Sequence, residues 1–220
     1  MQVVADLHRS QGVSLRLGVR VEGIDSGGAT AASVRLAGGT RIEADAVVAG
    51  IDATPRTSLA ANAGLEVTDG IMTTAALRTS DPDIFAAGDV ASAYHPLLGR
   101  HVRVEHWANA LKQPAVAAAA MLGQEVRYED LPYFYTDQYD LGMEYLGDAR
   151  DGYDQVVVRG DLEGREFIAF WLKDGRVLAG MNVNVWGVTD SIENLIRSGH
   201  PVTADALADA GTPLDDLAAG

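Results

Sequence analysis

The sequence predicts a chain that begins as an α/β fold and continues as an α+β fold. Up to Gln124, short apolar runs end at glycines and alternate with helical segments, as buried strands and their connecting helices do. After Gly123 the composition becomes rich in aromatic and acidic residues. In that last part strands come first and helices last, which favours a separate α+β domain with an antiparallel sheet and helices.

Composition limits the functions that this chain can have. Its 220 residues are 47% hydrophobic, and 17 Lys and Arg against 31 Asp and Glu give a formal net charge of −14, which argues against nucleic acid as a partner. No apolar run approaches the roughly 20 residues that span a bilayer, so no membrane segment is predicted, and Met1 does not open a signal peptide. The absence of cysteine excludes disulfides and iron–sulfur ligation, and a cytoplasmic setting is expected.

Residues 2–50 are predicted to form one helix followed by short strands. The helix covers Gln2–Gln11, and Gly12 stands where its C-terminal cap belongs. Apolar runs and glycine pairs predict strands at Val13–Leu17, Val21–Asp25, Ser33–Leu36, Thr40–Glu43 and Ala44–Ala49, with hairpin turns at Gly27-Gly28 and Gly38-Gly39.

The stretch Leu77–Ala91 reads LRTSDPDIFAAGDVA and is the most informative part of the chain. Ile84–Ala87 has the length and apolarity of a buried strand, and Pro82 between two aspartates fixes the turn before it. Gly88 would end that strand and let a ligand approach the backbone, and Asp89 would then lie at a carboxyl end of the sheet, where ligands bind. An ordinary strand and turn of an α/β protein explains the same residues.

Arg103–Leu122 is predicted to be a strand end that leads into a long helix. Glu105, His106 and Trp107 lie at the helix start, where free N–H groups and the helix dipole favour negative charge. On the residues alone, Trp107 is better explained as a core anchor on an apolar helix face that includes Ala110, Leu111 and Met121. Pro114 is expected to kink the helix.

Residues 125–220 carry clear signals of a sheet followed by helices. Strands are predicted at Gln155–Arg159, Glu166–Lys173 and Val177–Val185, and Asp174-Gly175 is a strong hairpin signal. Helices are predicted at Thr189–Ser198, with Ile192, Leu195 and Ile196 inward, and at Thr203–Ala208, capped by Thr203. The tail from Thr212 is expected to dock loosely.

Three segments carry a family resemblance that covers nearly the whole chain. The Leu77–Ala91 motif and the helix start VEHWANA resemble flavin-binding parts of the FAD-dependent pyridine-nucleotide oxidoreductases. PYFYTDQYDLGMEYLG and AGMNVNVWGVTDSIENLI resemble the C-terminal domain of the ferredoxin and rubredoxin reductases that serve bacterial oxygenases. The resemblance implies partial FAD- and NAD(P)-binding Rossmann-type domains in residues 1–52 and 53–124, followed by a reductase domain in residues 125–220.

The resemblance also implies a set of cofactor contacts. Asp89 is expected at the ribityl chain of FAD, and Glu105, His106 and Trp107 beside the isoalloxazine. The full set of implied cofactor-binding residues is Gly88, Asp89, Val90, Glu105, His106, Trp107 and Ala110. No catalytic acid or base is required, because the flavin does the chemistry.

Two departures and one absence qualify the family pattern. Members usually have glycine where this chain has Asp52, in a loop close to the nicotinamide, and aspartate where it has Thr74. No G-x-G-x-x-G occurs in the sequence, so neither loop that would cradle a dinucleotide pyrophosphate is present. The chain therefore resembles the C-terminal half of a reductase.

The expected activity is transfer of electrons from NAD(P)H through FAD to a ferredoxin-like iron–sulfur protein or rubredoxin. The alternative is a remnant or split-gene module without catalysis alone, which another, upstream chain would complete. An acidic ferredoxin would need a basic patch, for which the candidates are Arg100, Arg103, Lys112 and Arg127.

Metal and hydrolase sites are not predicted. His95, His101 and His106 lack helical ligand spacing, and Asp137, Asp140 and Glu144 fit a solvent-facing sheet edge better than a cation site. No nucleophile elbow supports Ser-His-Asp hydrolysis.

Overall fold

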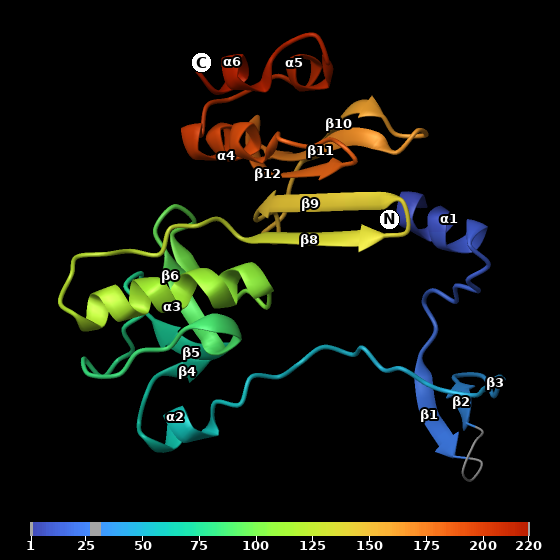
Figure 1. Ribbon diagram of the computed structural model, residues 1–220, viewed down its shortest axis with the longest axis horizontal. Helices are drawn as coiled ribbons and strands as arrows, with labels where there is room; N and C mark the ends of the chain where they lie inside the picture. Colours follow the sequence, from blue (N-terminus) through green and yellow to red (C-terminus); the bar gives the residue numbers. More distant parts are fainter. Residues whose placement is uncertain (1, 27–31, 220) are drawn as a thin grey trace. The chain divides into compact units, whose positions relative to one another are not determined.

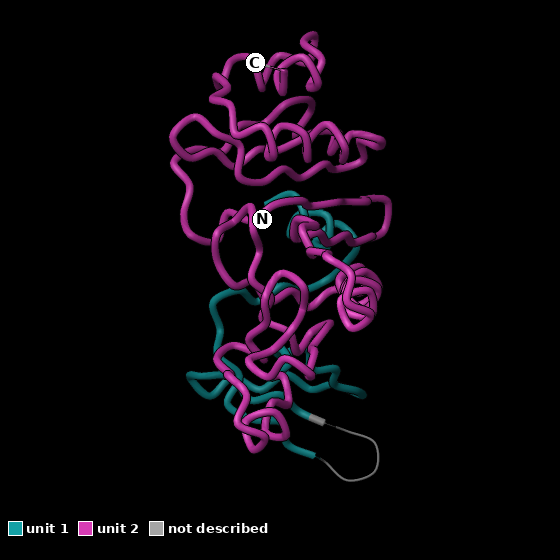
Figure 2. The backbone as a smooth tube through the Cα atoms, turned by 90° about the vertical axis from the view of Figure 1, so that its left-hand side faces the viewer, with its two compact units in different colours: residues 1–54 teal, residues 55–220 magenta. Residues whose placement is uncertain are grey.

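The computed structural model describes residues 2–26 and 32–219. The chain separates into two compact units, residues 1–54 and residues 55–220 (Figure 2). The further division predicted at residue 124 stays a prediction.

The first unit contains one helix and a three-stranded antiparallel sheet. Its elements are α1 (Gln2–Ser10), β1 (Val21–Ser26), β2 (Ala32–Leu36) and β3 (Arg41–Ala44), with strand order β1-β2-β3. Gly12 follows α1 with a φ of 85°, and Gly38 and Gly39 turn the chain with φ of 88° and 83°. The predicted helix cap at Gly12 and the predicted hairpin turn at Gly38-Gly39 are therefore confirmed. The predicted turn at Gly27-Gly28 lies outside the described residues.

Two strands predicted in this unit are wrong. Residues 13–17 and 45–49 form no strand, and Val48 is 97% exposed. Residues 13–17 alternate apolar and polar side chains and residues 45–49 are mostly apolar, and either pattern forms a strand only beside a hydrogen-bonded neighbour. The strands described in residues 2–26 and 32–54 pair with one another, and none of them lies beside either run.

The second unit begins with a small mixed sheet and a long helix. Its elements are α2 (Ser58–Asn62), β4 (Val67–Thr68), β5 (Gly70–Thr73), the 3-10 turn η1 (Gly88–Val90), β6 (Ala91–His95), β7 (Arg100–Val102) and α3 (Trp107–Met121). The sheet order is β4-β5-β6-β7, and only the β5–β6 pair is parallel among these described strands. Leu77, Ala93 and Ala117 form its small core.

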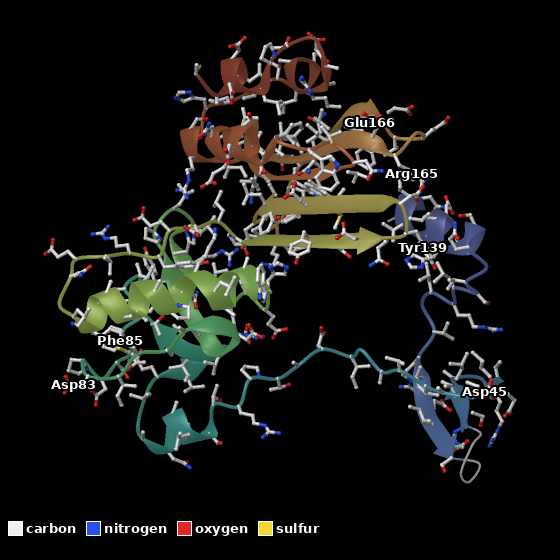
Figure 3. All side chains as sticks on the ribbon, in the orientation of Figure 1. Asp45, Asp83, Phe85, Tyr139, Arg165 and Glu166 are labelled. Carbon is white, nitrogen blue, oxygen red and sulfur yellow. The ribbon has the colours of Figure 1, made fainter. Side chains whose placement is uncertain are left out.

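The strand predicted at Ile84–Ala87 is also wrong. These residues fold back on 77–79 through the bonds Thr79 N to Ile84 O and Ala86 N to Leu77 O, and the only ladder pairing is an isolated bridge between Arg78 and Phe85. The turn at Pro82 is confirmed, because Asp81 Oδ1 accepts from the N–H of Asp83 at 2.9 Å. Phe85 also carries the Arg78 guanidinium over its ring, and its side chain is labelled in Figure 3.

Helix α3 buries a face different from the predicted one. Its buried residues are Asn109, Gln113, Ala117 and Ala120. Trp107, Leu111 and Met121 are 64%, 56% and 60% exposed, so the prediction that Trp107 anchors the core is wrong. Alanine and amide side chains on the inner face let the helix lie close to its neighbours, which turns the larger side chains outward. The helix continues through Pro114, which is exposed.

No helix within residues 2–26 and 32–219 combines the length and the apolar character that crossing a bilayer would require.

The rest of the second unit is a five-stranded antiparallel sheet with helices (Figure 1). Its strands are β8 (Tyr133–Gln138), β9 (Leu141–Gly147), β10 (Gln155–Asp161), β11 (Glu166–Lys173) and β12 (Arg176–Val183), in the order β10-β11-β12-β9-β8. Its helices are α4 (Thr189–Ser198), α5 (Ala204–Ala208) and α6 (Leu214–Ala218). The apolar faces of sheet and helices form the largest core of the described chain.

The sequence signals in this region are confirmed. Asp174 and Gly175 have φ of 50° and 73°, as a two-residue hairpin turn requires. The α4 side chains Ile192, Leu195 and Ile196 are buried, and Thr203 caps α5 by accepting from the N–H of Ala206. The fold class predicted for the chain, α/β followed by α+β, is confirmed.

The C-terminal tail is held more firmly than predicted. Leu214 is 7% exposed and belongs to the main core. From β10, the Arg159 guanidinium donates to the carbonyl oxygens of Asp209 and Thr212, each at 2.7 Å. The tail is therefore fastened to the sheet by both burial and hydrogen bonds.

A buried carboxylate joins β7 to the end of β9. The Asp148 side chain is 1% exposed and accepts from Arg100 of β7 and, at 2.7 Å, from Arg150. Burial alone would raise the pKa of Asp148, but the hydrogen bonds from Arg150 and the charge of Arg100 hold that pKa below its ordinary value.

We predict that D148N lowers the free energy of unfolding by about 2 kcal/mol at neutral pH, because the charged hydrogen bonds are lost. Since the folded-state pKa of Asp148 is depressed, its contribution is present above about pH 4 and disappears as the pH falls through the lowered pKa. Urea unfolding of the wild type and D148N at neutral and acid pH measures both effects.

The matched control is D140N, which removes an exposed ion pair between the turn after β8 and Arg165 in the turn after β10 (Figure 3). Exposed pairs contribute little, so D140N should unfold like the wild type. A D148N protein as stable as D140N would contradict the role of the buried pair.

Candidate functional site

Helix α3 holds the Gly88–Val90 turn in place. Gly88 is buried with a φ of 78°, which glycine adopts without strain, and its N–H donates to Gln113 Oε1 at 2.8 Å. Next to it, Asp89 is exposed, and its carboxylate has no hydrogen bond or ion pair with the described residues. The turn therefore presents a free carboxylate on a backbone that is held in place.

Arg103 ties three segments together at the same place. Its Nε donates to Asp69 at 2.9 Å, and its Nη1 donates to Glu105 and, at 3.3 Å, to the carbonyl oxygen of Asp89. The Arg103 side chain is only 15% exposed. Arg103 therefore sets the position of Glu105 relative to the Gly88–Val90 turn.

The start of α3 is capped and carries an exposed aromatic ring. His106 is the N-cap, and its Nδ1 accepts from the N–H of Ala108 at 3.2 Å. Asn109 Nδ2 donates to the carbonyl oxygen of Val104 at 3.0 Å, which holds the entering chain. Trp107, the first helical residue, is 64% exposed. The remaining N–H groups of this first turn give the site a positive electrostatic end.

The five-stranded sheet reaches this helix start through two tyrosines. The His106 ring meets the rings of Tyr133 and Tyr135 edge to face, at centroid distances of 6.0 and 5.3 Å. Both tyrosines belong to β8. The site is thus bordered by the mixed sheet, by α3 and by the C-terminal sheet.

The structure brings the predicted cofactor residues together. Gly88, Asp89 and Val90 form η1, which packs on α3, and a Cβ on Gly88 would lie 4.0 Å from the Cβ of Ala110. Glu105, His106 and Trp107 precede or begin the same helix. Whether these seven residues bind a cofactor stays a prediction.

Sequence reasoning missed the residues that hold this arrangement. Asn109 and Gln113 are each 2% exposed and lie one helical turn apart in a helix rich in alanine. Two amides at that spacing among alanines are a readable signal of buried hydrogen bonding. Arg103 was considered only as part of a partner surface.

The predicted basic patch is largely neutralised within the chain. Arg100 pairs with Asp148 and Asp151, Arg103 with Asp69 and Glu105, and Lys112 with Asp130 at 2.8 Å. For Arg127 the described residues provide no ion pair. Three of the four candidates are therefore not free cations.

His95 and Glu144, which are not predicted to be metal ligands, have other partners. His95 is buried, and its Nε2 lies 3.1 Å from the carbonyl oxygen of Asp130, while burial lowers its pKa. Glu144 accepts from Tyr133. Among the described residues no cluster of three or more His, Asp or Glu side chains could hold a metal ion.

Comparisons with known proteins give the chain a family. The model of the pyridine nucleotide-disulphide oxidoreductase family matches residues 1–114, and the reductase C-terminal model matches residues 133–218. The chain is 38% identical to the putidaredoxin reductase of Pseudomonas putida over 97% of this chain and 51% of that protein. It is 41% identical to the ferredoxin–NAD(+) reductase component of the anthranilate 1,2-dioxygenase system of Burkholderia cepacia, over 92% of this chain and 50% of that protein.

Solved structures agree with this result. The ferredoxin reductase of the CYP199A2 system from Rhodopseudomonas palustris has a TM-score of 0.91 at 33% identity, with coverage of 99% of this chain and 54% of that one. The reductase in the covalent putidaredoxin reductase–putidaredoxin complex has a TM-score of 0.89 at 38% identity, with coverage of 99% and 52%. The chain spans about half the length of these relatives.

The residues present fit the flavin end of such a protein. An unpartnered carboxylate at Asp89, a glycine with positive φ beside it and a capped helix start with an exposed tryptophan can receive a polar chain and a flat ring system. FAD and NAD(P)H, the cofactors predicted from the sequence, are those of the matched family. The chain belongs to the pyridine nucleotide-disulphide oxidoreductase family.

Proposed function

We propose that this chain provides the flavin-facing and C-terminal parts of an NAD(P)H-dependent ferredoxin or rubredoxin reductase in the cytoplasm. The observation that carries the proposal is the frame formed by Gln113, Arg103 and His106, which holds Asp89, Glu105 and Trp107 at one place. The relatives named as a putidaredoxin reductase and as the ferredoxin–NAD(+) reductase component of a dioxygenase system support the same activity.

The chain's own residues would bind and orient the flavin. The carboxylate of Asp89 can accept hydrogen bonds from hydroxyl groups of the ribityl chain, and nothing in the described chain competes for it. The first turn of α3 offers N–H groups to the pyrimidine edge, an interaction of about 0.3–1 kcal/mol for a full negative charge. Trp107 and Tyr135, both exposed, can shield the ring system from water.

FAD, when bound, supplies the redox chemistry by accepting a hydride from NAD(P)H and releasing single electrons. The protein contributes no acid or base in this scheme. Glu105 is held by Arg103, which also pairs with Asp69, so its charge is partly offset before any cofactor arrives.

Asp52 bears on the nicotinamide side of the proposal. Its φ of 66° is a conformation that glycine adopts most readily and that aspartate tolerates better than most residues. This explains how aspartate can occupy a position where the family usually has glycine. We propose that its carboxylate weakens NAD(P)H binding by repelling the dinucleotide phosphates.

The proposed electron acceptor is a ferredoxin-like iron–sulfur protein or rubredoxin. The structural relative solved as a covalent complex with putidaredoxin supports an acceptor of this class. Because Arg100, Arg103 and Lys112 are paired within the chain, Arg127 is the one candidate cation left from the predicted patch for which the described residues provide no carboxylate partner.

The alternative is a module without catalysis alone, completed by an upstream chain that supplies the dinucleotide-binding half. The absence of G-x-G-x-x-G from the sequence and the exposure of Val48 and Ile51, 97% and 87%, favour it for the isolated chain.

We predict that FAD quenches the fluorescence of Trp107, because this exposed indole lies where the ring system would sit. Titration of the chain with FAD should lower tryptophan emission, and W107F should lose most of the quenching. The matched control is W186F, since Trp186 is 60% exposed but lies in the loop after β12. Equal quenching in W107F and the wild type would show that the flavin does not bind beside Trp107.

We also predict that the purified 220-residue chain holds FAD weakly and does not oxidise NAD(P)H. The contacts available lie at one end of the cofactor, and the pyrophosphate-binding loops are not in the sequence. The bound-flavin absorbance, the molecular mass and the NADH and NADPH oxidation rates check this. A yellow, monomeric preparation that oxidises either nucleotide would contradict the alternative of an incomplete module.

A further inference from the structure

A polar network links three neighbouring strands of the C-terminal sheet, β12, β9 and β8. The Tyr133 hydroxyl donates to Glu144 Oε1 at 2.8 Å, and Asn182 Nδ2 donates to Glu144 Oε2 at 2.8 Å. Asn182 Nδ2 also donates to the carbonyl oxygen of Val185 at 2.8 Å. Because Asn182 lies opposite Glu144 in the β12–β9 register, the sheet itself fixes the carboxylate.

Glu144 keeps the Tyr133 hydroxyl as a hydrogen-bond donor. Burial, followed by the hydrogen bond to Glu144, raises the pKa of Tyr133 to about 12. The phenol is therefore a hydrogen-bond donor throughout the neutral range. Its bond to a carboxylate oxygen is charge-assisted and holds the ring in one orientation.

The held ring of Tyr133 contacts the cap of α3. The planes of Tyr133 and His106 meet at 83° with centroids 6.0 Å apart, an edge-to-face arrangement. His106 can cap the helix only while Nδ1 has a lone pair directed at the N–H of Ala108. The orientation of the His106 ring thus decides whether the first turn of α3 is capped.

We infer that Tyr133 and Glu144 are positioning residues, through which the C-terminal sheet holds His106 as the cap of α3 and so fixes the helix start that faces the flavin. The flavin-facing part of this inference rests on the proposed function. The cap itself is a property of this chain without any cofactor.

The main test is Y133F in the 220-residue chain, because this variant keeps the ring and deletes only the hydroxyl. Hydrogen exchange of the Ala108 amide should become faster by about fivefold, the factor that corresponds to the typical cost of losing a helix cap. The ring nitrogen signals of His106 in NMR should move from those of a single tautomer toward an average of the two.

Two further variants separate positioning from general stability. E144A should reproduce Y133F, because it deletes the oxygen that accepts from the Tyr133 hydroxyl. The matched control is Y94F, because Tyr94 also meets a histidine ring edge to face, that of His101, and its hydroxyl has no partner among the described residues. Y94F should leave the Ala108 amide and His106 unchanged.

Unchanged Ala108 exchange and unchanged His106 signals in Y133F would overturn the inference, as would equal effects of Y133F and Y94F. A second measurement, FAD titration followed by tryptophan quenching, tests the flavin-facing part. Weaker FAD binding by Y133F supports it, and altered exchange with unaltered FAD binding overturns it. If the wild type shows no response to FAD, the proposed function fails, and the exchange data alone decide the role of Tyr133.

Discussion

The candidate site depends on two buried amides of α3. Gln113 accepts from the N–H of Gly88, and Asn109 donates to the carbonyl oxygen of Val104, so one helix holds the segments that carry Asp89 and Glu105. Neither segment belongs to a sheet ladder at that point. An unpaired buried amide or carbonyl costs about 1–3 kcal/mol, so these bonds strongly disfavour any other placement of the two segments.

Arg103 also holds the site together. Its positive charge reduces the repulsion between the acidic residues that lie around it. It donates to the carboxylates of Asp69 and Glu105 and to the backbone carbonyl oxygen of Asp89, so one cation contacts two carboxylates. One positive charge thus offsets part of the local negative charge in a chain that carries −14. At Asp148 the ratio is reversed, because one carboxylate lies between Arg100 and Arg150.

The sequence predicted best where the signals are local. The helix Thr189–Ser198 and the strand Glu166–Lys173 were predicted with the bounds that the structure has, because an amphipathic period and an Asp-Gly turn are properties of adjacent residues. The strand predictions at Val13–Leu17, Ala44–Ala49 and Ile84–Ala87 were wrong. A run of apolar residues, or of alternating apolar and polar residues, forms a strand only if a partner strand lies beside it, and the run itself carries no information about the partner.

Helix α3 shows why a hydrophobicity rule and the family resemblance gave different predictions for the candidate site. A rule that places large apolar side chains inside predicts Trp107 and Leu111 in the core, yet the structure buries Asn109 and Gln113 and exposes both of the others. This inverted pattern costs stability unless the buried amides are bonded. Gln113 Oε1 bonds to Gly88 and Asn109 Nδ2 to Val104, which offsets part of that cost, while Asn109 Oδ1 has no partner among the described residues. Helix α3 therefore uses its buried amides to hold neighbouring backbone and leaves the Trp107 indole exposed at its start. This arrangement is the physical basis of the VEHWANA motif.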